Sequence, residues 1–249
     1  MKKITLAATL ALLATPVVQA DTIFGVYAGA GVWQSDYTGD VGSDDLNTSL
    51  KDLGFKEKDS NFYYIALEHP VPVIPNILLK HTSLTSKQTS TLSRTFEIDG
   101  TVYLVGERIT SDFDLTHTDA TLYYEVLDNW ANLDIGITAR IFDGYIRAES
   151  ALLNKPEKVT VDDTLPMLYA KVQFDLPFTG LSAGAEGNYV SYKDDKVSDY
   201  SVKVSYLFDS AFDVGVEVGY RQLSVTVDDD EVNATVKLKG PYAAAIFHF

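Results

Sequence analysis

Residues Tyr200–Phe208 read YSVKVSYLF, and the alternation within this segment decides the fold class. Large apolar or aromatic side chains occupy every second position, and Ser201, Lys203 and Ser205 lie between them. Successive side chains of a β-strand point to opposite faces, so the pattern predicts a strand with one apolar and one polar face. The pattern returns in Val214–Arg221, VGVEVGYR, after a short link at Ser210.

Ten segments of the chain carry this alternation and are predicted to be strands. Their predicted bounds are 22–36, 60–69, 75–86, 113–127, 131–143, 164–176, 180–192, 198–209, 211–226 and 232–249. The links after the even-numbered segments are short, and those after the odd-numbered segments are longer. Outer-membrane barrels show this asymmetry, with short periplasmic turns and long extracellular loops. The sequence therefore predicts an all-β fold: a transmembrane antiparallel up-and-down β-barrel, with ten strands favoured over eight or twelve.

The N-terminus has the features of a secretory signal. Lys2–Lys3 form a basic start, Ile4–Ala14 form an apolar core, and Val18–Ala20 form a small-residue cleavage pattern. The apolar core is shorter than the roughly 20 residues that a membrane-spanning helix needs. We expect residues 1–20 to be a signal peptide and residues 21–249 to form one barrel domain in the outer membrane of a Gram-negative envelope.

The composition argues against some classes of protein. The formal net charge of −15 disfavours nucleic-acid binding, which requires a basic face. The chain has no cysteine, so no disulfide stabilises it. Its hydrophobic content of 46% looks ordinary for a soluble domain. A membrane barrel has a similar average, because only every second residue of its strands faces lipid.

The C-terminus helps to decide which face of the strands is turned outward. Alternation alone does not separate a membrane barrel from a soluble, lipocalin-like barrel, which would bury its apolar face. Here Ala243, Ala245, Phe247 and Phe249 alternate, and the chain ends on an aromatic residue. This ending resembles the assembly signal of outer-membrane barrels, so we predict that Phe247 and Phe249 form that signal. Aromatic residues near both ends of the strands also fit the interfacial belts of membrane barrels.

The last predicted strand contains an irregularity. Val236 and Leu238 are even-numbered, whereas the apolar residues after Gly240-Pro241 are odd-numbered. Proline has no backbone N–H for a ladder, and in closed sheets it belongs at bulges. We expect a bulge at Gly240-Pro241 that returns the apolar residues to one face.

The polar faces of the predicted strands carry charged residues some four to nine positions from the short turns. On the lipid side a Lys or Arg would cost about 2–4 kcal/mol at mid-membrane, so we place these residues in the lumen. This lumen charge ladder is Glu68, Lys80, Glu125, Arg140, Lys171, Glu186, Lys203 and Glu217. Four members are acidic and four are basic, so they can pair. The favoured interpretation is a salt-bridge plug in a narrow lumen, and the alternative is a narrow polar conduit.

Two long loops are expected to carry local structure. Residues 43–54 begin with Ser-Asp-Asp, place leucines at helical spacing and end on glycine, which predicts a short amphipathic helix. Asp99-Gly100 lies between two short apolar stretches and predicts a hairpin tip. The third and fourth strands are therefore expected to extend past the membrane as a ribbon.

Motifs for catalysis or metal binding are weak. None of His69, His81, His117 and His248 has metal-ligand spacing to another candidate ligand. His117 and Asp119 share a strand face and could supply a general base to a hydrolase, although a solvated strand end is the favoured interpretation. No nucleophile elbow or phosphate loop is present. We predict no catalytic residue, no metal site and no cofactor, and therefore no enzyme.

Three features together resemble a known group of proteins. They are the proline-rich turn at Glu68–Ile77, EHPVPVIPNI, the Leu-Gly-Phe at 53–55, and the terminal Phe249. With the signal peptide, they resemble a family of uncharacterised Gram-negative outer-membrane β-barrel proteins of about this length. The resemblance implies a barrel in the outer membrane and carries no catalytic residues. The architecture is more distantly similar to small barrels of the outer-membrane protein A and X types. Omptin-class proteases also have ten strands, but their Asp pair and Asp–His pair have no match here.

Three functions follow from this sequence as hypotheses. The first is a barrel with a charge-filled lumen that serves a structural or surface-interaction role. The second is a narrow, porin-like channel for small solutes, and the third, less favoured, is an outer-membrane hydrolase. The expected partners are outer-membrane lipid, lipopolysaccharide and the barrel assembly machinery, with no nucleic acid. The sequence does not define an oligomeric state.

Overall fold

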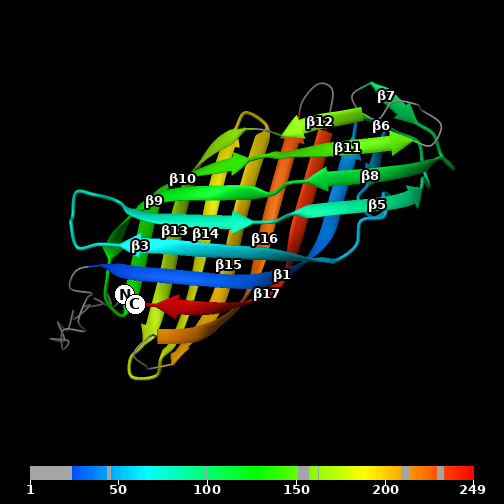
Figure 1. The fold of residues 1–249 in the computed structure, drawn as a ribbon. Helices are drawn as coiled ribbons and strands as arrows, with labels where there is room; N and C mark the ends of the chain where they lie inside the picture. The colour runs from blue at the N-terminus through cyan, green and yellow to red at the C-terminus, as the bar shows by residue number, and fades with distance from the viewer. Residues whose placement is uncertain are drawn as a thin grey trace, which may run out of the picture.

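A computed structural model describes residues 24–43, 46–98, 100–150, 157–161, 163–208, 213–228 and 233–249. Ten strands of the main antiparallel sheet form a closed wall in the order β17-β16-β15-β14-β13-β10-β9-β4-β3-β1, and β17 pairs with β1 to close it. The wall strands are β1 (Gly25–Gly42), β3 (Lys58–Glu68), β4 (Asn76–Thr82), β9 (His117–Leu127), β10 (Ala131–Phe142), β13 (Thr164–Leu176), β14 (Leu181–Tyr192), β15 (Asp195–Phe208), β16 (Asp213–Asp228) and β17 (Asn233–His248). The predicted ten-stranded up-and-down barrel is confirmed (Figure 1). The proposed signal peptide lies outside the described residues.

The two ends of the barrel differ. At the short-turn end, links such as 128–130 and 177–180 join neighbouring strands, and both ends of the described chain lie there (Figure 1). Val26 and Phe249 exchange two backbone hydrogen bonds at this end of the seam, of 2.8 and 3.1 Å. The opposite, long-loop end carries additional strands. The described part of the chain contains no helix long and apolar enough to cross a membrane.

A second sheet extends one side of the barrel at the long-loop end. Its strands are β5 (Thr85–Thr91), β8 (Arg108–Asp114), β11 (Gly144–Ser150) and β12 (Glu157–Val161), in the order β12-β11-β8-β5. Each continues a wall strand after a break of one to two residues, as β5 continues β4 across Ser83-Leu84. The hairpin of β6 (Phe96–Ile98) and β7 (Thr101–Tyr103) caps this extension, with Gly100 at positive φ. The predicted ribbon with a tip at Asp99-Gly100 is thus confirmed in its described part.

The predicted helix over 43–54 is wrong. In its described part the segment forms β2 (Asn47–Ser49), which pairs with β1, followed by turns. Leu50 and Leu53 are buried in the apolar cluster of the long-loop half. The leucines therefore belong to a turn that packs inward. Pairing with β1 and burial of the leucines outweigh the weak helix propensity of this segment.

The predicted longer loop after the seventh strand is also wrong. β14 and β15 are joined by the two residues Lys193 and Asp194, with Lys193 at φ 54°. The hairpin extends farther than its alternation suggests, because residues 193–199 are polar except for Val197 and give no repeated apolar signal.

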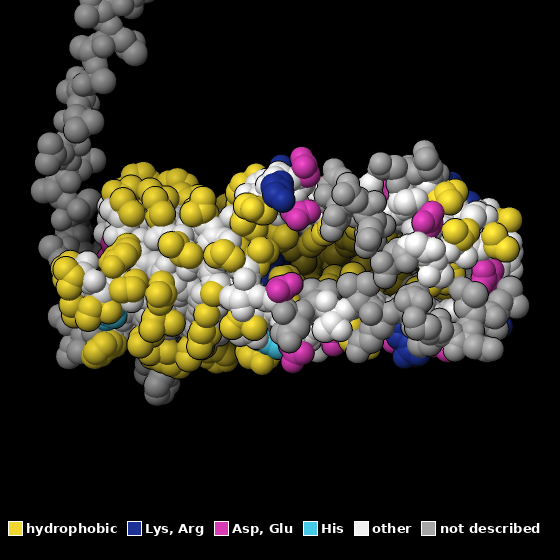
Figure 2. All heavy atoms as spheres, turned by 90° about the horizontal axis from the view of Figure 1, so that it is seen from above, with side chains coloured by type: hydrophobic (Ala, Val, Ile, Leu, Met, Phe, Trp, Pro, Cys, Tyr) yellow, Lys and Arg dark blue, Asp and Glu magenta, His cyan; other side chains and the backbone are white. Residues whose placement is uncertain are grey.

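The wall has an apolar outer surface in its short-turn half. Outward side chains of β10, β15 and β16 form the outer apolar band, and they include Ile135, Ile137, Val202, Val204, Val216 and Val218, which are 49–61% exposed. Figure 2 shows hydrophobic side chains covering the wall in this half and charged side chains toward the other. On the same strands, the polar residues that alternate with these outward side chains, such as Lys203 and Glu217, face the lumen. This arrangement is that of a barrel which meets lipid on the outside.

The polarity of the wall reverses in the long-loop half. There Lys237 and Lys239 of β17 are exposed on the outside, whereas Leu238 between them is fully buried inside. Trp33 and Tyr37 of β1 are likewise fully buried. They belong to a cluster, here called the apolar cap, with Phe55, Leu223, Leu238 and further residues of the loops. This half is therefore built like a water-soluble barrel, with an apolar interior and a polar exterior.

The expected bulge at Gly240-Pro241 is wrong. β17 pairs with β16 in one unbroken register, from Asp228↔Asn233 to Asp213↔His248. No bulge is needed because Leu238 does not face outward: it packs inward, into the apolar cap. On the other side the ladder with β1 pauses at Gly240 and Pro241, and the Trp33 indole N–H donates to the Gly240 carbonyl at 3.2 Å. A side chain thus satisfies a backbone group where proline interrupts the ladder.

Candidate functional site

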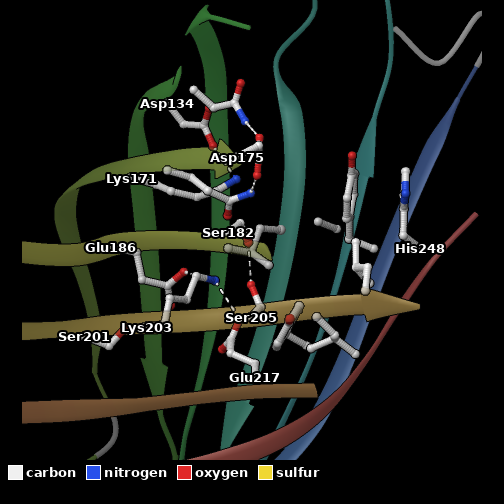
Figure 3. Close-up of a pocket in the computed structure, with 18 of the residues that line it drawn as sticks. Asp134, Lys171, Asp175, Ser182, Glu186, Ser201, Lys203, Ser205, Glu217 and His248 are labelled. Carbon is white, nitrogen blue, oxygen red and sulfur yellow. Dashed lines mark hydrogen bonds and ion pairs between the residues drawn. The ribbon is translucent and has the colours of Figure 1, made fainter. Parts of the chain in front are cut away.

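A cavity of about 380 Å³ occupies the short-turn half of the lumen. Its rim includes the exposed residues Asp128 and Gly180, and its lining extends inward to Lys80 and Arg221. We call it the lumen cavity. Figure 3 shows charged side chains from several strands directed into it. The cavity is the candidate functional site because it is concave, reaches the rim at one end and is lined by charged side chains from several strands.

The deepest part of the cavity holds a chain of four ionic residues, here called the central network. Lys80 Nζ lies 2.7 Å from Glu186 Oε1. Lys203 Nζ lies 3.7 Å from Glu186 Oε2 and 3.0 Å from Glu217 Oε2 (Figure 3). The Tyr242 hydroxyl donates to Glu217 at 2.8 Å. Lys80 is on β4 and Glu186 is on β14, four places apart in the sheet, so their ion pair crosses the lumen.

Nearer the short-turn end the cavity becomes acidic. Lys171 Nζ lies 2.9 Å from Asp134 Oδ2, its direct neighbour in the β10–β13 ladder. The Tyr123 hydroxyl donates to Glu68 at 2.7 Å. The remaining carboxylates of this region are Glu125, Asp128 and Asp175, and Asp175 accepts hydrogen bonds from Asn132 and Gln173.

Beyond the cavity lies a buried network of two arginines and two aspartates, here called the arginine network. Arg140 donates to both oxygens of Asp119 and to Asp199 Oδ2, each at 2.7 Å. Arg221 donates to both oxygens of Asp199, at 2.9 and 2.6 Å. All four are at most 5% exposed. Arg221 also lies over the Trp33 ring, 4.7 Å from its centroid, and so joins the network to the apolar cap.

Strand parity explains how the sequence brings these residues together. Side chains at alternate positions share a face, and paired residues on neighbouring strands lie side by side. The ladders align Glu125 with Asp134, Asp134 with Lys171, and Lys171 with Glu186. A row of charged groups therefore follows from the register of four consecutive wall strands.

The structure places seven members of the sequence-derived charge ladder around the lumen cavity. They are Glu68, Lys80, Glu125, Lys171, Glu186, Lys203 and Glu217. The eighth, Arg140, lies in the arginine network. Glu186, Lys203 and Glu217 lie together on three consecutive strands, as their spacing predicts.

Sequence reasoning missed several inward charges, among them Asp119, Asp134, Asp199 and Arg221. Each shares the parity of a ladder residue on its own strand, as Asp199 does with Lys203 and Arg221 with Glu217. Considering every charged residue of that parity, instead of one per strand, would have identified them. Three of them, Asp119, Asp199 and Arg221, belong to the arginine network, so the predicted ladder omitted the most buried ion pairs.

His117 and Asp119 both face the interior of the barrel. His117 is 1% exposed, and its Nδ1 lies 2.9 Å from the Leu115 carbonyl. His117, Asp119 and Asp199 are close enough to hold a metal ion. However, both carboxylates are already bound by guanidinium groups, and a third positive charge beside two arginines is unfavourable. The geometry therefore does not fit a metal site.

The two residues of the predicted assembly signal lie at the end of the closing strand. Phe247 and Phe249 are 38% and 55% exposed, and Phe247 pairs with Ala28 across the β1–β17 seam. Their position next to the last backbone hydrogen bonds of the seam places them where the barrel is closed.

Comparison with known proteins defines the fold class. No family model matches the chain, and no curated protein sequence matches it either. Among solved structures, the outer-membrane protease OmpT from Escherichia coli is similar over 90% of this chain and 97% of its own, with a TM-score of 0.51 and 9% identity. The transport unit of the autotransporter AIDA-I from Escherichia coli and a FadL homologue from Pseudomonas aeruginosa align with TM-scores of 0.40 and 0.34, each at 9% identity. They cover 96% and 91% of this chain, and 93% and 90% of their own.

The chain therefore has the closed β-barrel fold of outer-membrane proteins. At 9% identity the likeness to OmpT concerns the fold alone.

Proposed function

We propose that this protein is an integral outer-membrane barrel that is closed to ion flow and serves the cell through its long-loop half. In this proposal the outer apolar band meets lipid, the short turns face the periplasm and the polar half projects outward. Residues 1–20 act as the signal peptide that directs export. The projecting part offers the four-stranded sheet and the β6–β7 hairpin to partners at the cell surface.

The observation that carries the proposal is the closure of the lumen by side chains. The Lys80–Glu186 pair crosses the lumen, and Arg140 of β10 reaches Asp199 of β15, three places away in the sheet. On the long-loop side of these ion pairs, the apolar cap contains Trp33, Tyr37 and Leu238, each fully buried. A barrel of about eight strands is just filled by its side chains, and ten strands add little room.

A conductance measurement tests this function. The refolded mature chain is inserted into planar lipid bilayers in 1 M KCl. We expect no steady current above that of the bare bilayer. A reproducible unitary conductance would contradict the closed barrel and favour the channel, for which the lumen cavity is the supporting observation. Fractionation of cells tests location, and we expect the protein with the outer membrane.

The hydrolase hypothesis has less support. His117 is almost completely buried and Asp119 is held by both donors of the Arg140 guanidinium. A catalytic base must come within hydrogen-bond reach of its substrate. In the described residues this pair lies in the arginine network, where no substrate reaches it.

A further inference from the structure

The lumen cavity contains more carboxylates than its cations neutralise. Lys171, Lys80 and Lys203 pair with Asp134, Glu186 and Glu217. Four further carboxylates line the cavity toward the short-turn end: Glu68, Glu125, Asp128 and Asp175. In the described part of the chain, none of these four has a Lys or Arg nitrogen within 4 Å. We call them, with Asp134, the acidic mouth.

One oxygen of the Asp134 carboxylate is buried without a hydrogen-bond donor in the described part of the chain. This residue is 1% exposed, and its Oδ2 accepts from Lys171. Its Oδ1 is buried and has no hydrogen-bond partner among the described residues. A buried carboxylate oxygen without a donor costs free energy, so this lining residue lacks a donor that a ligand can supply.

The surroundings of Asp134 add to this demand for a positive donor. Glu125 lies directly opposite Asp134 in the β9–β10 ladder. Like charges placed directly opposite one another are unfavourable. Glu68 lines the cavity near the same end. Three carboxyl groups therefore lie near one another beside a single lysine, Lys171.

The shape and lining of the cavity indicate which kind of cation fits. In the described residues, the only set of ligands compact enough for a metal ion lies in the arginine network, outside the acidic mouth. Among the described residues, no three carboxylates of the mouth have oxygens close enough together to surround one metal ion. Tyr123 and Tyr169 line the same region, with ring centroids 5.9 Å apart. An ammonium group has three donors and binds both carboxylates and aromatic faces.

We propose that the acidic mouth binds a small organic cation, an aliphatic amine carrying one or more ammonium groups, that enters from the short-turn end. One ammonium group donates to Glu125, the exposed carboxylate that lies opposite Asp134, and the carbon chain extends along the cavity. The volume of about 380 Å³ is within the usual range for small-molecule sites. This site does not depend on whether the lumen conducts.

Isothermal titration calorimetry on the refolded mature chain in detergent tests the proposal. The probe is 1,5-diaminopentane, titrated at 50 mM NaCl. Glu125→Gln removes one carboxylate of the mouth and leaves the ion pairs of Lys80, Lys171 and Lys203 in place. We expect wild type to bind the diamine and Glu125→Gln to bind it at least tenfold more weakly. Asp134→Asn is expected to lose binding as well.

A matched control separates the site from the overall charge of the protein. Glu57→Gln makes the same charge change at an exposed position in a long loop, at the other end of the barrel. We expect its affinity to equal that of wild type, and heat-modifiable gel migration confirms that each variant is folded. Absence of diamine binding to wild type, or equal weakening by Glu57→Gln and Glu125→Gln, would overturn the proposal. A parallel titration with MgCl₂ that binds at least as tightly would replace it with a metal site.

Discussion

Lys203 has two carboxylate neighbours that differ in what else they bind. Glu217 lies 3.0 Å from Lys203 Nζ and also accepts from Tyr242. Glu186 lies farther away, at 3.7 Å, and has Lys80 at 2.7 Å. Lys203 is therefore the sole cation of Glu217 among the described residues, whereas Glu186 has a second one. The two carboxylates should respond differently when Lys203 is removed.

Replacing Lys203 by methionine tests this asymmetry. We expect Lys203→Met to lower the free energy of unfolding by about 1–3 kcal/mol, because Glu217 is left in the lumen without its cation. Adding Glu217→Gln should recover part of the loss, with a coupling of about 0.5–3 kcal/mol. Adding Glu186→Gln should recover less, since it leaves Lys80 unpaired. Urea unfolding in lipid of wild type, Lys203→Met, Glu217→Gln and the two double variants measures this, and additive effects of Lys203→Met and Glu217→Gln would show that the two do not interact.

The arginine network depends on one of its aspartates more than on the other. Asp199 binds both Arg140 and Arg221, whereas Asp119 binds Arg140 alone. We expect Asp199→Asn to destabilise the protein by about 3–5 kcal/mol, because buried Arg221 loses the one carboxylate with which it pairs among the described residues. Asp119→Asn should cost less, since Arg140 keeps Asp199. Equal unfolding midpoints for the two variants would contradict this order.

At the scale of the element, β17 shows what alternation can and cannot predict. Its strand character, parity and pairing at the chain end all follow from the sequence. The sequence does not show which of the two alternating faces points into the lumen, because the interior is polar in one half of the barrel and apolar in the other. Leu238 and Lys203 both face the lumen although one is apolar and the other charged. Assuming one apolar face throughout led to the false bulge at Gly240-Pro241.

Single-cysteine labelling of β17 tests where the outer face of this strand leaves the membrane in the proposed outer-membrane barrel. The chain has no native cysteine, so each label reports one site. Spin labels at Ala243 and Ala245 should be more accessible to oxygen dissolved in lipid than to a water-soluble relaxing agent. Labels at Lys237 and Lys239 should show the reverse, because these side chains are exposed beyond the outer apolar band. Lipid-type accessibility at all four positions would place the whole strand in the membrane and refute the reversal of polarity.

At the scale of the whole molecule, the sequence predicts the wall better than the contents of the lumen. Barrel closure, strand number and the hairpin at Gly100 follow from local patterns. Which charges meet does not, because partners such as Lys80 and Glu186 are 106 positions apart and face each other across the lumen. The apolar cap was not foreseen for the same reason: Trp33, Leu53 and Leu223 come from distant segments that only the closed barrel brings together.

The lumen is therefore obstructed by two different kinds of layer, in series. The central network is ionic and borders the lumen cavity, whereas the arginine network and the apolar cap are buried. Shortening a residue of the central network enlarges the cavity but leaves the layer above it intact. Ions can pass only if the apolar cap is opened as well. The cap meets the arginine network where Trp33 stacks on Arg221.

This order of layers makes a prediction about conductance that a uniform charge plug does not make. Lys203→Ala should remain closed in planar bilayers, because the apolar cap still fills the long-loop half. The double variant Trp33→Ala/Arg221→Ala should pass a measurable steady current, because it removes the largest buried side chain of the cap and the guanidinium beneath it. Asp199 keeps Arg140 in that variant, so part of the arginine network survives, and heat-modifiable migration verifies folding. If Lys203→Ala conducts and the double variant does not, the central network is the seal and the apolar cap only stabilises the projecting wall.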